Sequence, residues 1–251
     1  MNALAVSSIV FGCVFAAAMV GMAMRRALPE DHLGADGKEV VRLSTALIST
    51  MAAIILGMLV SSAKGSYDAR KNEVAEMSSE ILIIDRLMAR YGEETGEIRA
   101  QFRQVVEDGI ERIWPKDAAQ RGQLRPEGNA DILVDKLDHL TPKNDFQAAT
   151  KAQVMPQILS LRQTQWLMFL KTQQSSIPKP LLIILVVWLA GIFLSFGLFA
   201  PPNPTVFVTL GLSALAVSAA IFLILEMYTP FSGILRISPA PVMEALRQMG
   251  R

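Results

Sequence analysis

The sequence is poor in the residues on which enzymes and metal sites depend. It has 251 residues with one cysteine and two histidines, which excludes an internal disulfide, and it lacks paired metal-ligand spacings and glycine-rich phosphate loops. A charge surplus is also missing, because 24 basic residues are balanced by 23 acidic ones, whereas a nucleic-acid partner needs a basic excess. These absences predict a protein that is not an enzyme, carries no cofactor or metal and does not bind nucleic acid.

One group of carboxylates allows a different reading. Asp131, Asp135 and Asp138 fall on one face of a short helix beside His139, and carboxylate oxygens are the ligands that a hard cation prefers. A solvated helix face is the commoner reason for such a group. We therefore favour a solvated face, with a cation site as the alternative.

What the sequence has in abundance is long apolar runs. Hydrophobic residues make up 51% of the chain, and the mean hydropathy is +0.35. All basic residues lie outside four runs, 3–24, 43–60, 181–200 and 205–225, each about as long as a helix that crosses the hydrocarbon core. Backbone amides in lipid must be hydrogen-bonded internally, so each run is expected to be a helix. The sequence predicts an all-α membrane protein with four spans.

A charged helical domain is expected between spans two and three. Residues 61–180 contain 17 basic and 17 acidic residues, together with two series of apolar residues spaced by three and four. The first series is Val74, Met77, Ile81, Ile84, Met88 and Tyr91, and the second includes Val154, Ile158 and Leu161. If span two continues into the first series, the helix from Leu43 to Tyr91 is about 75 Å long.

The two series are expected to pack against each other in an antiparallel stalk that shorter helices close. The predicted organisation is therefore a transmembrane hairpin at 1–60, the stalk domain at 61–180, and a second hairpin with an amphipathic C-terminal tail at 181–251.

Basic residues near the span ends indicate the orientation. Four spans place both termini and the stalk domain on one side, which carries Lys64, Arg70, Lys71, Arg162, Lys171, Lys179, Arg236 and Arg247, against Arg25, Arg26, Lys38 and Arg42 on the other. Cytoplasmic segments carry the excess of Lys and Arg, so this count favours a cytoplasmic stalk. Arg25 and Arg26, directly after the first span, favour the opposite orientation.

Span two contains a stripe of small or hydroxyl side chains at every fourth residue. Its members are Thr45, Ser49, Ala53, Gly57 and Ser61. Small residues let membrane helices pack closely, which is the commoner explanation, and the alternative is that they line a narrow ion path.

Glu226 is the carboxylate that directly follows span four, and Pro230 and Phe231 follow it closely. An acidic residue at a helix end is commonly an interfacial anion that water solvates. The alternatives are a gate, a proton site or an ion-contacting group.

Three groups of residues carry a resemblance to a known family. They are the segment 66–70 with Glu73, Asp85 and Arg86; the run 111–115, which ends in Trp114 and Pro115; and the ending from Leu225 and Glu226 through 230–233 to Ile237 and Ser238. Their order and spacing around four spans resemble the bestrophin-like domain proteins of bacteria. The resemblance extends over nearly the whole chain.

Bestrophins are pentameric anion channels with helical cytosolic domains, so the resemblance implies a homo-oligomer, suggests five subunits, and points to the bacterial inner membrane. The leading hypothesis is a pore for an inorganic ion, anions favoured, with span two nearest the axis and membrane lipid around it. The alternative is a non-conducting scaffold or sensor that recruits a partner through its stalk. A transporter ranks third, because no internal repeat is visible.

Overall fold

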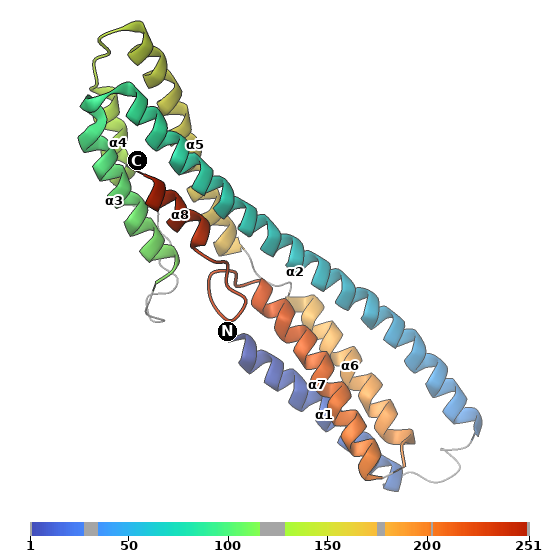
Figure 1. Ribbon diagram of the computed structural model, residues 1–251. Helices are drawn as coiled ribbons and strands as arrows, with labels where there is room; N and C mark the ends of the chain where they lie inside the picture. Colours follow the sequence, from blue (N-terminus) through green and yellow to red (C-terminus); the bar gives the residue numbers. More distant parts are fainter. Residues whose placement is uncertain (1, 28–34, 116–128, 175–178, 202, 250–251) are drawn as a thin grey trace. The chain divides into compact units, whose positions relative to one another are not determined.

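The protein is all-helical in the computed structural model, which describes residues 2–27, 35–115, 129–174, 179–201 and 203–249 (Figure 1). Within these ranges the helices are α1 (Ala3–Ala27), α2 (Ala35–Tyr91), the 3-10 turn η2 (Glu93–Thr95), α3 (Gly96–Ile113), α4 (Asn129–Asp138), α5 (Asp145–Gln174), α6 (Lys179–Phe199), α7 (Pro204–Met227) and α8 (Ala240–Gln248).

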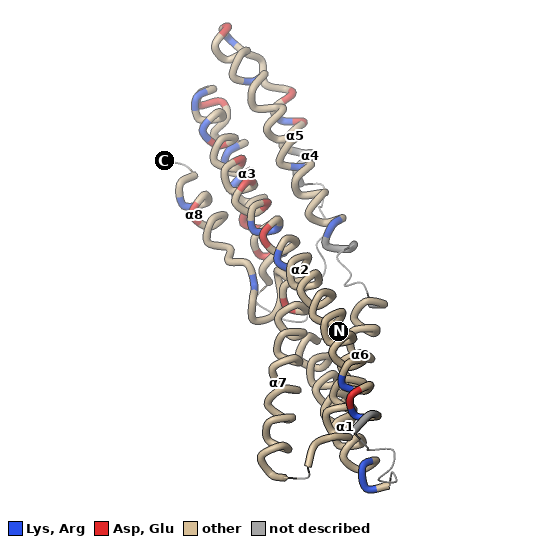
Figure 2. Tube along the Cα trace, turned by 90° about the vertical axis from the view of Figure 1, so that its right-hand side faces the viewer, with Lys and Arg blue, Asp and Glu red and all other residues tan. Residues whose placement is uncertain are grey.

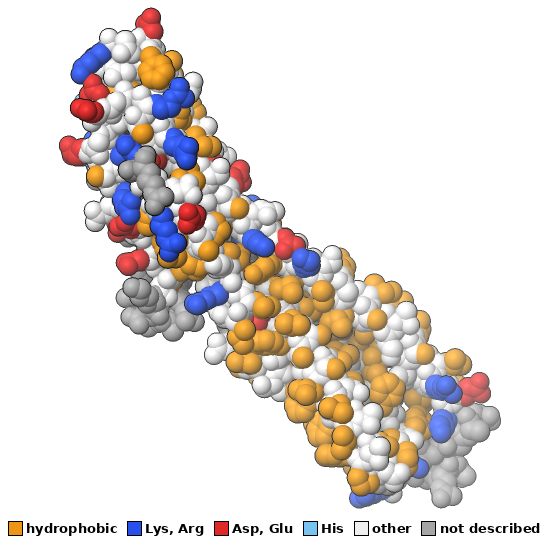
Figure 3. Space-filling model, viewed as in Figure 1, with side chains coloured by type: hydrophobic (Ala, Val, Ile, Leu, Met, Phe, Trp, Pro, Cys, Tyr) orange, Lys and Arg blue, Asp and Glu red, His pale blue; other side chains and the backbone are white. Residues whose placement is uncertain are grey.

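Four of these helices are long and apolar enough to cross a membrane, namely α1, the first part of α2, α6 and α7. The prediction of a four-span helical protein is thus confirmed. The long α2 also confirms that span two continues without a break into the first apolar series, since no residue between Val60 and Tyr91 interrupts it. Hydrophobic side chains dominate the visible surface over the four spans (Figure 3).

The chain divides into two compact units. The membrane unit comprises residues 1–66 and 176–229, and the helical unit comprises residues 67–175 and 230–251. The sequence-based ranges had joined the C-terminal tail to the second hairpin, whereas here it belongs with the helical unit. The physical reason is burial: Val242 and Ala245 of α8, and Met249 directly after it, are part of the core of the helical unit.

The core of the helical unit contains both predicted apolar series. Residues of α2 and of α5 are buried in one cluster, so the expected seam between these two helices is present. Helix α3 adds Ile98, Phe102 and Val106 to the cluster, and α4 adds Leu133 and Leu137. Charged residues lie along the helices of this unit (Figure 2). Most are at the surface, but Arg70, Glu80 and Asp85 of α2 are buried.

Helix α1 holds the membrane unit together, because it packs on both α6 and α7. Its contact with α6 is unusually close at two glycines. A Cβ atom at Gly21 would collide with the carbonyl oxygen of Leu194, and one at Gly197 would collide with that of Ala18. Only glycine lets the two backbones touch in this way, which is how membrane helices gain packing energy without a hydrophobic driving force between them.

This crossing predicts that Gly197→Val prevents the membrane unit from packing. The added side chain must push α6 away from α1, and overpacking of this kind costs at least about 2 kcal/mol. Thermal unfolding and size-exclusion profiles in mild detergent measure the loss.

Gly191→Val is the matched control on the same helix, because a Cβ atom at Gly191 meets nothing within 4 Å. Equal behaviour of the two variants would rule out the close α1–α6 contact.

Candidate functional site

The span-two stripe does not remain on one face of α2. Thr45 is buried, with 8% exposure, and Ser49 is half-buried, whereas Ala53, Gly57 and Ser61 are exposed. A step of four residues exceeds one helical turn, so a stripe with this period rotates by about 40° at each step. The stripe therefore starts at Thr45 on the packed face of α2 and ends at Ser61 on the exposed face.

The packed face of α2 follows a different period. Thr45, Ala52 and Leu59 are buried and lie seven residues apart. Seven residues nearly complete two turns, so this series drifts only slowly around the helix. The residues that hold α2 in the membrane unit are therefore Thr45, Ala52, Leu59 and Ala63, of which the sequence-predicted stripe contained only Thr45.

The remaining surface of α2 is not covered by its own chain. Within the most apolar window of each span, 11% of the α2 residues are buried, against 22% in α1, 28% in α6 and 33% in α7. Large side chains such as Leu43, Leu47, Ile54 and Met58 are more than 60% exposed, and small ones such as Gly57 lie between them. This open face meets either lipid or another protein surface.

Glu226 lies on the buried side of α7, next to Ile224 and Leu225, and is only 5% exposed. It engages an interaction partner, so it is not an uncompensated charge in an apolar environment. The expected interfacial anion in open water does not fit this burial, and a role of Glu226 as a gate or ion-contacting group stays a prediction. Nearby, the hydroxyl groups of Ser62 and Tyr228 are 3.2 Å apart and link α2 to the end of α7.

Pro230 and Phe231, the other two gate candidates, belong to the helical unit. Pro230 is buried, and its carbonyl oxygen accepts a hydrogen bond of 2.8 Å from the backbone N–H of Ile237. The ring of Phe231 packs edge-on against Trp114, with 5.8 Å between ring centroids. A role of these two residues in gating stays a prediction.

The same contacts fasten the segment 230–237 to the end of α3. The indole Nε1–H of Trp114 donates a hydrogen bond of 2.8 Å to the carbonyl oxygen of Ile237. Gly233 completes the loop with a φ of 92°, a conformation that favours glycine. Two motifs that lie more than a hundred residues apart in the sequence therefore form one packed cluster, which their spacing alone did not reveal.

Ion pairs occupy the other motif positions. Asp85, whose side chain is 5% exposed, accepts two hydrogen bonds from Arg99 of α3, at 2.9 and 3.0 Å. This fork-like contact raises the pKa of Arg99 above its usual value. Glu73 binds Arg70 at 3.1 Å and Lys171 of α5 at 2.6 Å. These pairs connect α2 to α3 and to α5.

The bestrophin-like domain matches residues 12–242. The chain belongs to the bestrophin-like domain family. The match extends from within α1 into α8, so it includes most of the first span, the other three spans and the segments 66–70, 111–115 and 225–238. No curated protein and no solved structure matches the chain.

The acidic group near residue 135 gives this bestrophin-like protein no metal centre in the described part of the chain. Asp135, Asp138 and His139 are exposed, and His139 Nδ1 lies 2.6 Å from the carbonyl oxygen of Asp135. The side chain of Asp131 lies outside the described residues. Among those described, no three His, Cys, Asp or Glu side chains are placed to hold a metal ion.

The Asp85–Arg99 pair predicts a loss of stability in Asp85→Asn. Removing one charge from a largely buried pair leaves the other poorly compensated, and Arg99 is 24% exposed at its side chain, which reduces the penalty to about 2–3 kcal/mol. Chemical unfolding of the purified protein, followed by circular dichroism, measures it.

Glu107→Gln serves as the control on α3, because Glu107 pairs with Arg103 on the surface, where both side chains are close to half exposed. Loss of such a pair changes stability by about 0.5 kcal/mol or less. If Asp85→Asn behaves like this control, the Asp85–Arg99 pair does not stabilise the helical unit.

Proposed function

We propose that this bestrophin-like membrane protein is a homo-oligomeric ion channel, with anions as the favoured ions and α2 nearest the axis. The observation that supports this proposal best is the uncovered face of α2, the least buried of the four spans. A helix with exposed small residues among large apolar ones is suited to close contact with further copies of the chain. The number of subunits, five by the family resemblance, belongs to the same proposal.

The open part of the stripe would then border the ion path. Ala53, Gly57 and Ser61 are exposed, and a Cβ atom at Gly57 meets nothing within 4 Å. A narrow path between helices requires small side chains at this position. Ser49 is less suited to bind an anion, because its hydroxyl group donates a hydrogen bond of 2.7 Å to the Thr45 carbonyl oxygen of the same helix.

Gly57→Leu is predicted to lower ion flux severalfold in liposomes that contain the purified protein. The leucine fits within a single chain, so it is expected to leave the fold intact and to narrow only the space around the axis. Anion and cation flux, measured separately with ion-sensitive dyes, give the result.

Gly12→Leu is the control, because a Cβ atom at Gly12 of α1 also meets nothing within 4 Å. A Gly57→Leu protein that assembles like wild type and conducts equally would contradict a pore along α2. In the same assay, Glu226→Gln tests whether Glu226 borders the path. If it does, loss of its negative charge is expected to speed anion entry and to slow cations.

The proposed orientation places both termini and the helical unit in the cytoplasm, with the spans in the bacterial inner membrane. It rests on the larger number of basic residues that flank the helical unit.

Cysteine labelling tests this orientation in a Cys13→Ala background. An impermeant maleimide added to spheroplasts is expected to label Ala27→Cys, at the end of α1, and not Ala149→Cys, on the exposed side of α5. After lysis both are expected to react. The reverse pattern in intact spheroplasts would invert the topology. Gln123, an obvious loop position from sequence, lies outside the described residues.

A non-conducting scaffold is the second candidate, and one surface favours it. The seam between α2 and α5 is buried in one core with residues of α3 and α4, so its apolar residues are not open to a partner. The outer side of α5, however, exposes four large apolar side chains: Leu159, Trp166, Leu167 and Leu170. Absence of flux together with a protein partner that binds this side would favour the scaffold.

A further inference from the structure

A cavity of about 630 Å³ lies inside the membrane unit, where α2 begins, α6 ends and α7 begins. Its volume is within the range of about 300–1,000 Å³ typical of small-molecule sites. Residues at the ends of apolar spans lie at the level of the lipid headgroups. The cavity therefore opens where the polar and the hydrocarbon parts of a bilayer meet.

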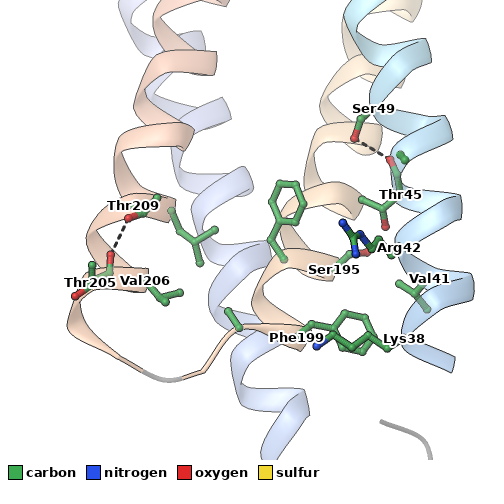
Figure 4. A pocket seen from close by; sticks show the side chains of 14 residues that line it. Lys38, Val41, Arg42, Thr45, Ser49, Ser195, Phe199, Thr205, Val206 and Thr209 are labelled. Atoms are coloured by element: carbon green, nitrogen blue, oxygen red, sulfur yellow. Dashed lines mark hydrogen bonds between the residues drawn. The ribbon is translucent and has the colours of Figure 1, made fainter. Parts of the chain in front are cut away.

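Two cations line one side of this cavity. Lys38 and Arg42 are four residues apart, so they project from the same face of α2. Figure 4 shows Arg42 and Thr45 pointing from α2 toward the space that Val206 and Thr209 of α7 border on the other side. No ion pair between described residues involves either cation, and Glu39, the neighbouring carboxylate, is not among the residues that line the cavity.

The deeper walls are mostly apolar. They include Phe196 and Phe199 of α6, and Val206 and Leu210 of α7. The hydroxyl groups of Ser195 and Thr209 also face the cavity, but each already donates a hydrogen bond to a carbonyl oxygen one turn earlier in its own helix, at 3.0 and 2.8 Å. Beyond the two cations, the cavity thus offers few free donors.

A small inorganic anion fits this arrangement poorly. It would lose its hydration in the apolar part of the cavity without enough hydrogen bonds to replace it. A molecule with an anionic head and a hydrocarbon chain fits better, because Lys38 and Arg42 can bind a phosphate group while the chain covers Phe196, Phe199 and Val206.

We propose that the cavity between α2, α6 and α7 is a binding site for an anionic phospholipid, with its phosphate on Lys38 and Arg42 and an acyl chain along α6 and α7. The lipid fills the gap between the open start of α2 and the α1–α6–α7 packing. Binding does not depend on conduction, so this site and the proposed channel can fail independently.

The test compares lipid binding in detergent solution by native mass spectrometry and thermal shift. The probes are phosphatidylglycerol, phosphatidylcholine and inorganic phosphate, added to delipidated full-length protein. Wild type is expected to bind phosphatidylglycerol preferentially. Each charge-assisted hydrogen bond to phosphate corresponds to roughly a tenfold change in affinity, so Lys38→Gln with Arg42→Gln should weaken that binding at least about tenfold.

Arg26→Gln is the matched control, because Arg26 is exposed at the same end of the membrane unit and does not line the cavity. It should bind phosphatidylglycerol as wild type does. Thr209→Phe, which fills the cavity from α7 without changing charge, should weaken binding in parallel with the double variant and keeps the test valid if loss of both cations impairs folding.

Three results would overturn the proposal. Unchanged phosphatidylglycerol binding in both the double variant and Thr209→Phe would remove the cavity from consideration. Equal binding of phosphatidylcholine would indicate an apolar groove without headgroup recognition. A thermal shift with inorganic phosphate as large as that with phosphatidylglycerol would assign the site to a free anion.

Discussion

The backbone contact between α1 and α6 is the constraint on which the membrane unit depends. In lipid, apolar side chains gain little by moving from hydrocarbon to a neighbouring helix, so cohesion must come from close packing. Gly21 and Gly197 allow that packing, since at each position the facing helix backbone occupies the space of a Cβ atom. With α6 and α7 both packed on α1, α2 is left at the periphery, where it is held mainly by Thr45, Ala52, Leu59 and Ala63.

The peripheral position of α2 produces both features that we connect with function. Its outer face remains uncovered by the described part of its own chain, which is the observation behind the proposed oligomer. At its start, it stands far enough from α6 and α7 to leave a cavity, and the cations on its first turns point into that cavity. Helix α2 therefore presents an apolar surface with small side chains among large ones on one side. On another side, its cations line an otherwise apolar pocket. A tightly packed fourth helix would have neither.

The helical unit is stabilised by different physics. Its helices bury an apolar core, and contacts between a few charged and aromatic residues fix how the helices meet. Asp85 with Arg99, and Trp114 with Phe231, join segments that are distant in the sequence. Ion pairs on the surface add little to the stability of this unit. Hydrogen bonds from Lys143 and Lys136 lower the pKa values of Glu94 and Glu97, but water solvates both carboxylates and weakens the pairs. The motif residues of this unit thus act in the contacts between its helices, and these contacts account for their positions.

The four spans and the seam of the helical unit could be predicted from the amino-acid sequence alone, and the length of α2 followed once span two was taken to continue. Lipid forces any long uncharged run into a helix, and the spacing of Val74 to Tyr91 matches the helical period. It did not determine which faces meet. The four-residue stripe in α2 looked continuous, yet helical geometry carries it from the packed to the open face, and Gly57 is on the open side. Gly197 was not distinguishable from Gly191, and the C-terminal tail could not be assigned to the helical unit. Those features depend on contacts between distant segments, and local composition does not encode which partner a surface will meet.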